Sequence, residues 1–212
     1  IFLDNLLDHF TAMDTLEAFN RALFLAINGT LATPVWLVDI ASLIANYVIY
    51  LVPLLLAGMW LCGSDAQRSL AIRACLVAML GVGANQLIGL VWQHPRPFMI
   101  GLGHTFLAHA PDSSFPSDHA TVFAGIVLTL LLGRAHWLGV LTLLAGVSVA
   151  WARIFLGVHF PLDMLGAVVV ACVAYFLVAP FWDLGGAAVT QWAIALYRKL
   201  LARPIDLGWL RR

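Results

Sequence analysis

The sequence predicts an all-α membrane protein, a polytopic bundle of about five transmembrane helices preceded by an N-terminal interfacial helix. Of the 212 residues, 62% are hydrophobic and only 10% are charged, whereas about a quarter of the residues in a soluble domain are charged. The mean hydropathy is +0.94. Because no internal repeat, low-complexity stretch or linker divides the sequence, we expect residues 1–212 to form a single domain.

The segment before Pro34 is expected to form an amphipathic helix in the membrane interface. Its apolar residues, such as Phe19, share the segment with polar ones such as Glu17, and the apolar core is too short to span. Residues 1–12 include acidic side chains and no basic stretch, so we do not expect them to act as a signal peptide. Met13 offers an alternative start, which would make residues 1–12 an addition to the native chain.

Five apolar runs after this helix are the expected transmembrane spans. A span needs roughly 20 apolar residues, and the third run reaches that length only if the polar residues before it line a cavity. Pro53 lies inside the first run. The runs are Pro34–Leu61, Leu70–Trp92, Ala120–Leu132, Trp137–Phe155 and Leu162–Phe181.

The basic residues predict how the bundle is oriented, because loops rich in Lys and Arg are retained in the cytoplasm. If Leu70–Trp92 runs outward, eight of the eleven basic residues lie in or beside cytoplasmic turns, and the N-terminal helix lies outside. The eight are Arg68, Arg73, Arg134, Arg198, Lys199, Arg203, Arg211 and Arg212.

Three polar clusters fall at the outer ends of the expected helices, where they can converge on one site. The opposite ends carry only scattered Arg and Lys. This asymmetry predicts that the chemistry is concentrated on a single face. The clusters are Gln93–Phe98, Ser113–His119 and Arg153–Asp163.

The third cluster contains a histidine and a carboxylate in the pattern of an oriented nucleophile. His159 and Asp163 are four residues apart, and Pro161 between them suits the first turn of a helix. A carboxylate one turn along can accept the Nδ1 proton of the imidazole and leave Nε2 as the attacking nitrogen. The alternative is a helix-stabilising pair worth a few tenths of a kcal/mol.

Two arginines and a second histidine favour chemistry on phosphate. Arg96 and Arg153 lie on the outer face, away from almost all other basic residues, and guanidinium groups bind phosphate oxygens through charge-assisted hydrogen bonds. Anchoring at the membrane interface is the alternative for either arginine. Ser117 and Asp118 suit a helix start, where free N–H groups bind an anion. His119 beside them is a natural general acid.

In order along the chain, the clusters contain Arg-Pro, Pro-Ser-X-His and Arg-x5-His-x3-Asp. This order resembles the type 2 phosphatidic acid phosphatase superfamily, which includes integral membrane lipid phosphatases and soluble vanadium haloperoxidases. The motif region, residues 93–166, is similar to the bacitracin-resistance-type undecaprenyl-diphosphate phosphatases. The matching segments are Pro95-Arg96-Pro97-Phe98, His109-Ala110, Ser114-Phe115-Pro116-Ser117-Asp118-His119, Arg153 and Leu156-Gly157-Val158-His159-Phe160-Pro161-Leu162-Asp163-Met164-Leu165-Gly166.

The resemblance implies hydrolysis of undecaprenyl diphosphate to undecaprenyl phosphate and inorganic phosphate, through a phosphohistidine and without a metal or other cofactor. By matching position, His159 is the nucleophile, Asp163 its orienting residue and His119 the general acid. The protein would lie in the bacterial inner membrane with its active site facing the periplasm or outer surface, recycling the lipid carrier for peptidoglycan synthesis. The implied phosphate ligands are Arg96, Ser117 and Arg153.

Three positions depart from the superfamily pattern. Gly89 stands where the superfamily has a lysine, and Ala152 replaces the serine that usually precedes the arginine of the third motif. Asp118 stands at a glycine position, and it would repel a phosphate unless it is turned away, protonated or bonded to a neighbour such as Arg96 or a histidine. Other candidates for the pocket, each otherwise a solvated loop residue, are His94, His104, His109 and Asp112.

The same motifs fit phosphatases of other lipids: phosphatidylglycerol phosphate, phosphatidic acid or lipid A. A lipid or ion transporter is a weaker alternative, because its ionisable residues would lie near the bilayer midplane on broken helices. The formal net charge of zero gives no basic surface for nucleic acid, and Arg96 and Arg153 would oppose a metal cation. The expected partners are the polyprenyl diphosphate substrate and membrane lipids, with no obligate protein partner inferred.

Overall fold

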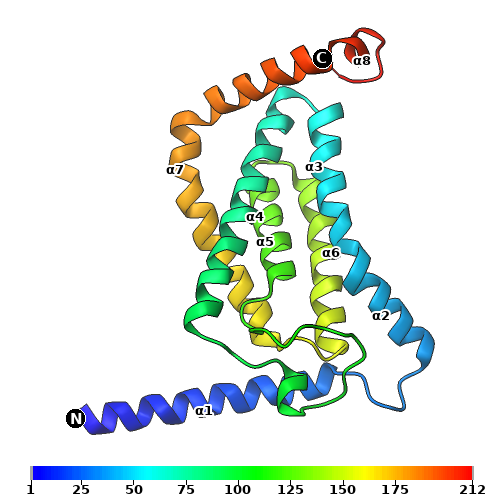
Figure 1. The fold of residues 1–212 in the computed structure, drawn as a ribbon. Helices are drawn as coiled ribbons and strands as arrows, with labels where there is room; N and C mark the ends of the chain where they lie inside the picture. Colours follow the sequence, from blue (N-terminus) through cyan, green and yellow to red (C-terminus); the bar gives the residue numbers. More distant parts are fainter. Residues whose placement is uncertain (1, 212) are drawn as a thin grey trace.

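The computed structural model describes residues 2–211, with side chains from residue 14 onward. This part of the chain contains helices and no strand. Most of the helices run side by side as a bundle, and α1 lies across one end of it (Figure 1). The elements are α1 (Phe2–Ile27), α2 (Val35–Tyr47), η1 (Val48–Tyr50), α3 (Leu51–Cys62), α4 (Asp65–Val91), η2 (Pro97–Ile100), α5 (Asp118–Leu132), α6 (His136–Phe155), α7 (Pro161–Leu200) and α8 (Ala202–Asp206).

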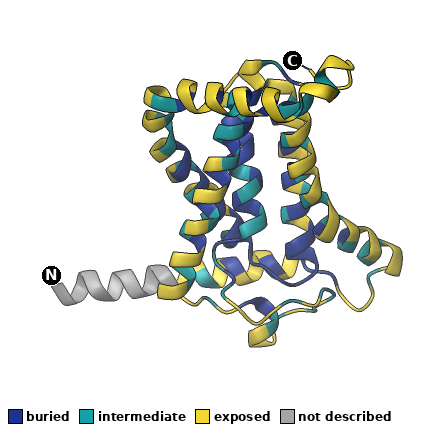
Figure 2. Cartoon of the chain, turned by 45° about the horizontal axis from the view of Figure 1, so that its top comes forward, coloured by how far each residue is buried: buried dark blue, intermediate teal, exposed yellow. Residues whose placement is uncertain are grey.

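The expected all-α membrane bundle is confirmed. Within residues 2–211, four helical segments, Val35–Cys62 among them, are long and apolar enough to cross a membrane, and α5 is a shorter apolar helix. α5 lies inside the bundle against α4, α6 and α7, and most of its residues are buried (Figure 2). Phe123 and Leu130 of α5 share a core with Ala74 of α4. Because α5 is enclosed by other helices, its polar first turn can line a protein cavity instead of facing lipid.

Two spans differ in shape from the sequence expectation. The first, expected as one run over Pro34–Leu61, is interrupted by η1. The interruption precedes Pro53, which has no N–H for the carbonyl of Ile49 and crowds that carbonyl with its ring. The last span was expected to end at Phe181, but α7 continues for 40 residues in all, with Pro180 inside it. The second half of α7 turns across the end of the bundle opposite to α1 (Figure 1).

The N-terminal segment forms one helix, α1, that lies across the end of the bundle instead of joining it (Figure 1). Leu16 and Phe19 on its outer side are exposed, whereas Asn20 and Phe24 are buried. This two-sided arrangement agrees with the expected interfacial helix. The alternative start at Met13 concerns residues whose side chains lie outside the described part of the chain.

A buried arginine ties the C-terminal segment to the end of the bundle that lies opposite α1. The guanidinium of Arg68 donates to the carbonyl of Trp60 at 2.9 Å and to the carbonyl of Arg211 at 2.7 Å. It also lies over the ring of Tyr197, 4.6 Å from the centroid. The turn that contains Arg134 joins α5 to α6 at the same end (Figure 1). Arg68, Arg134 and Arg211 therefore lie at the end of the molecule opposite to the three polar clusters.

Candidate active site

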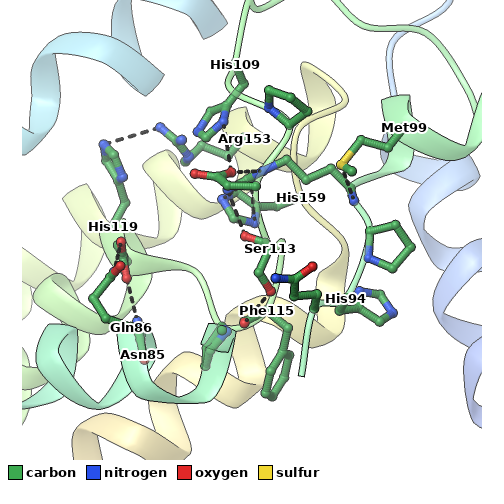
Figure 3. A pocket seen from close by; sticks show the side chains of 18 of the residues that line it. Asn85, Gln86, His94, Met99, His109, Ser113, Phe115, His119, Arg153 and His159 are labelled. Atoms are coloured by element: carbon green, nitrogen blue, oxygen red, sulfur yellow. Dashed lines mark hydrogen bonds and ion pairs between the residues drawn. The ribbon is translucent and has the colours of Figure 1, made fainter. Parts of the chain in front are cut away.

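The three polar clusters meet in one pocket at the end of the bundle beside α1. The pocket has a volume of about 580 Å³. Its wall is built from the end of α4, the loops that follow it, the first turn of α5 and the last turn of α6 (Figure 3). Asp163 lies outside this wall, bonded to His159, and Ser117 does not reach the wall. The candidate residues in the wall are His94, Arg96, His109, Asp112, Asp118, His119, Arg153 and His159.

His159 and Asp163 form a buried pair at the start of α7, as their spacing predicted. Nδ1 of His159 lies 3.1 Å from Oδ2 of Asp163, and the two side chains are 3% and 1% exposed. The same oxygen accepts the N–H of Phe160 at 2.7 Å and the hydroxyl of Ser114. Three donors fix the carboxylate, so the imidazole has a defined tautomer with its proton on Nδ1 and a lone pair on Nε2.

The surroundings of His159 favour its neutral ring. Its pKa is lowered to about 4, first because burial disfavours the charged form, and further by the charges of Arg96 and Arg153, while Asp163 acts in the opposite direction. Only the neutral ring has a lone pair with which to attack phosphorus. Nη1 of Arg96 lies 3.1 Å from Nε2, so an anion held by Arg96 would lie next to the attacking nitrogen.

Arg96 is fixed by atoms of two loops. Its Nε donates to Oδ1 of Asp112 at 2.8 Å, its Nη1 to the carbonyl of Val158 at 2.8 Å and its Nη2 to the carbonyl of Ser113 at 3.1 Å. The side chain of Arg96 is 6% exposed, whereas that of Asp112 is 62% exposed. Arg96 therefore sits in a set position between the second and third clusters, with its charge partly balanced by a solvated carboxylate.

Arg153 and His119 face the pocket from neighbouring helices (Figure 3). Nη1 of Arg153 lies 3.3 Å from Nε2 of His119 and 3.4 Å from the carbonyl of Ala45. Arg153 is 4% exposed, yet its Nε has no hydrogen-bond partner among the residues that the structure describes. A buried guanidinium with an unused N–H can serve a phosphate oxygen.

The first turn of α5 points Ser117 and Asp118 in different directions. The hydroxyl of Ser117 accepts the N–H of Ala120 at 3.5 Å, so this side chain caps its own helix. Asp118 lies in the pocket wall and is held by α4: its Oδ1 accepts from Nδ2 of Asn85 at 2.8 Å and its Oδ2 from Nε2 of Gln86 at 3.1 Å. These carboxamides hold Asp118, in place of the arginine or histidine that the sequence suggested.

The other candidate histidines differ in their relation to the pocket. His94 lies in the wall, with Nε2 3.6 Å from a carboxylate oxygen of Glu17 in α1. His109 also lies in the wall, its ring centroid 6.2 Å from that of His159, and burial lowers its pKa. His104 is absent from the wall.

Two glycines of the third motif allow the loops to approach closely. Gly157 has a φ of +84°, and a Cβ at this position would collide with the carbonyl oxygen of His104. A Cβ at Gly166 would collide with the ring of Phe115. The glycines therefore allow the second cluster and the preceding loop to pack directly against the segment that carries His159.

The chain is similar to known proteins over most of its length. Residues 70–184 match the family described as the PAP2 superfamily. The chain is 38% identical over 196 residues to "Putative undecaprenyl-diphosphatase YbjG" of Escherichia coli (strain K12), covering 92% of this chain and 99% of that protein. It is 34% identical over 194 residues to undecaprenyl-diphosphatase BcrC of Bacillus subtilis (strain 168), covering 88% and 98%.

The fold is also found in a solved structure. The chain shares it, with a TM-score of 0.58, with a transmembrane PAP2 type phosphatidylglycerolphosphate phosphatase from Bacillus subtilis, covering 80% of this chain and 87% of that one. The sequences are 22% identical, so this likeness concerns the fold alone. The family match over residues 70–184 and the two relatives of nearly the same length show that the chain belongs to the PAP2 superfamily.

Proposed function

We propose that this protein is an integral membrane phosphatase that hydrolyses undecaprenyl diphosphate to undecaprenyl phosphate and inorganic phosphate. The observation that carries the proposal is the meeting, at one pocket, of the buried His159–Asp163 pair, His119 and two arginines. The names of relatives 38% and 34% identical over nearly their full lengths support the substrate. Lipid recycling for cell-wall synthesis follows from this reaction.

The first half-reaction transfers the terminal phosphoryl group to His159. Nε2 attacks the phosphorus in line with the bridging oxygen, the bond from phosphorus to that oxygen breaks, and its electron pair leaves with undecaprenyl phosphate. His119 gives a proton to the departing oxygen. Arg96 and Arg153 bind the nonbridging oxygens and stabilise their charge. Asp163 holds the Nδ1 proton and stabilises the cationic phosphorylated ring.

The second half-reaction releases inorganic phosphate. A water molecule attacks the phosphorus of the phosphohistidine while neutral His119 takes a proton from it. The bond between phosphorus and nitrogen breaks, its electron pair returns to Nε2 of His159, and protonated His119 is regenerated. Each step uses side chains of this chain and water, so we expect full activity in the presence of EDTA.

We further propose that the pocket opens at the periplasmic or outer surface of the bacterial inner membrane. The basic residues Arg68, Arg134 and Arg198 belong to the end of the bundle away from the pocket (Figure 1), and such residues are retained in the cytoplasm. Diphosphate carrier on the outer leaflet would then reach the pocket directly.

A phosphate-release assay on the purified full-length chain in detergent tests the proposed substrate. We expect release from a long polyprenyl diphosphate, with or without EDTA, at a kcat/KM at least tenfold above that for phosphatidic acid or phosphatidylglycerol phosphate. His159→Ala should be inactive on all three. A higher kcat/KM for either glycerolipid would show that the proposed substrate is wrong. Loss of activity on chelation, with recovery on adding one divalent metal, would contradict the metal-free reaction.

A further inference from the structure

Of the backbone N–H groups at the start of α7, the side chain of Asp163 accepts only that of Phe160, and α1 supplies an acceptor for the first free N–H inside the helix. Phe160 at the N-cap position of α7 makes no side-chain capping bond, and Pro161 after it has no N–H. The next N–H, that of Leu162, donates to Oδ1 of Asn20 at 3.1 Å. Asparagine is among the best capping residues, but it normally caps the helix that it begins. Here 142 positions separate the two residues.

Asn20 belongs to a face of α1 that follows the connection between α6 and α7. Phe24, one turn further along, is fully buried, and its ring packs edge-on against that of Phe160 with the centroids 5.4 Å apart. Asn28, another turn along, donates from Nδ2 to the carbonyl of Phe155 at 2.9 Å. Residues four apart lie on one face of a helix. This face of α1, continued by Asn28 just after the helix, therefore contacts the last residue of α6, the residue before α7 and the first turn of α7.

The burial of Asn20 is informative because two apolar residues near it in α1, Phe19 and Leu23, are exposed. Asn20 is 2% exposed, whereas Phe19 and Leu23 are 57% and 37% exposed. A buried amide costs free energy unless it is hydrogen-bonded. Simple docking of an interfacial helix would place an apolar residue at this position and expose the amide. The hydrogen bond to the N–H of Leu162 explains why the amide of Asn20 is buried while the apolar side chains are exposed.

We propose that Asn20 is a positioning residue: by capping α7 from α1, it fixes His159 and Asp163 relative to Arg96. The catalytic consequence rests on the proposed function. Arg96 is held from a separate loop by Asp112 and the carbonyl of Ser113, so a shift in the start of α7 changes the distance between Arg96 and the nucleophile. Misplacement of the order of 1 Å can cost about 100-fold in rate.

Three variants of the full-length protein in detergent test this role. Asn20→Ala removes the acceptor for the N–H of Leu162, and Asn20→Asp keeps an acceptor oxygen whose charge suits the start of a helix. Arg21→Ala is the matched control, because Arg21 is the next residue of α1 and its Nε bonds to Glu17 on the exposed surface. Rates are measured per folded protein on a polyprenyl diphosphate, below the melting temperature of every variant.

We expect Asn20→Ala to lower kcat by about tenfold with less than a twofold change in KM. Asn20→Asp should keep at least half of the wild-type kcat, and Arg21→Ala should match wild type. A merely structural contact predicts loss of folded protein at unchanged kcat. Wild-type kcat in Asn20→Ala, or an equal loss in Asn20→Asp, would overturn the proposal while leaving the phosphatase function standing.

Hydrogen exchange of the segment 158–166 tests the cap without any enzymatic assay. Asn20→Ala should speed amide exchange in this segment by about tenfold, while Asn20→Asp and Arg21→Ala should exchange as wild type does. If wild-type protein releases no phosphate from the polyprenyl diphosphate, the proposed function fails and this measurement alone decides the cap. An unchanged rate of amide exchange in Asn20→Ala would then show that Asn20 does not stabilise the start of α7.

Discussion

At the scale of single residues, sequence spacing predicts a reactive pair but not the groups that support it. His159 and Asp163 were expected to meet because residues four apart are neighbours on a helix, and they do. Ser114 was not expected at the same carboxylate oxygen, since 49 positions separate it from Asp163 and no local pattern joins distant segments. Ser117, expected to hold phosphate, caps α5 with its hydroxyl, and its role as a phosphate ligand stays a prediction.

Replacing Ser114 tests whether orientation of the carboxylate matters for the reaction. Ser114→Ala removes one of the three donors to Oδ2 of Asp163. We expect kcat for phosphate release to fall about tenfold, with KM nearly unchanged because Ser114 is absent from the pocket wall. Ser148→Ala removes a hydroxyl that donates to the carbonyl of Ala145 within α6, and it should have wild-type kinetics. Equal kcat in Ser114→Ala and wild type would show that the hydrogen bond from Ser114 to Asp163 does not matter for the reaction.

The lowered pKa of His159 predicts an unusual acid titration. Because the pKa is lowered to about 4, the ring should stay neutral as the pH falls through 6.5, the ordinary value for histidine, and gain its proton only near pH 4. ¹⁵N NMR of labelled histidine in detergent measures this directly. His159→Gln identifies the signal, because that resonance is missing from its spectrum. A midpoint at or above 6.5 for this signal would contradict the account of burial.

At the scale of elements, hydropathy locates the spans but not how they bend or end. Pro53 was noted inside the first run, yet its interruption by η1 depends on which carbonyl the ring crowds. α7 continues past Phe181 because one proline removes only one helical bond and bends the helix without ending it. Asn85 and Gln86 lie inside the span formed by α4, where polar residues usually have a partner or a function. That signal could have revealed the pair that holds Asp118.

The contact between α4 and α5 is testable by a double-mutant cycle. Asn85→Ala frees Oδ1 of Asp118, whose charge then opposes the substrate phosphates, so we expect KM to rise about fivefold to tenfold. In the background of Asp118→Gly, the same substitution should have almost no effect on KM. Thr121→Val, which removes the other partner of the Asn85 amide, is the control for lost packing. Additive effects of Asn85→Ala and Asp118→Gly would show that Asn85 acts independently of Asp118.

At the scale of the whole molecule, the two ends of the bundle carry different chemistry. The pocket and α1 lie at one end, and the basic C-terminal segment packs against Arg68 at the other (Figure 1). The sequence predicted this polarity from the order of its charges alone, because helices of similar length must alternate in direction. It could not predict that α1 contacts the α6–α7 connection, which depends on side-chain packing between distant segments.

Cysteine labelling tests which end faces outward. In a background without Cys62, Cys75 and Cys172, a single cysteine replaces either exposed Ala108 in the pocket loop or exposed His136 at the start of α6, at the opposite end. A membrane-impermeant maleimide applied to intact spheroplasts should label the cysteine at position 108 and spare the one at 136, and both should react after lysis. The reverse pattern would place the pocket in the cytoplasm.

The most direct test of the central claim is to isolate the phosphorylated enzyme. Wild-type protein is mixed with a polyprenyl diphosphate carrying ³²P in the terminal phosphate and quenched in alkali within the first turnover. We expect label on His159 that survives alkali and is lost in acid, labelling slower by about 100-fold or more in His119→Ala, and no label in His159→Ala. Turnover by wild type without such label, or full activity of His159→Ala, would contradict the central claim.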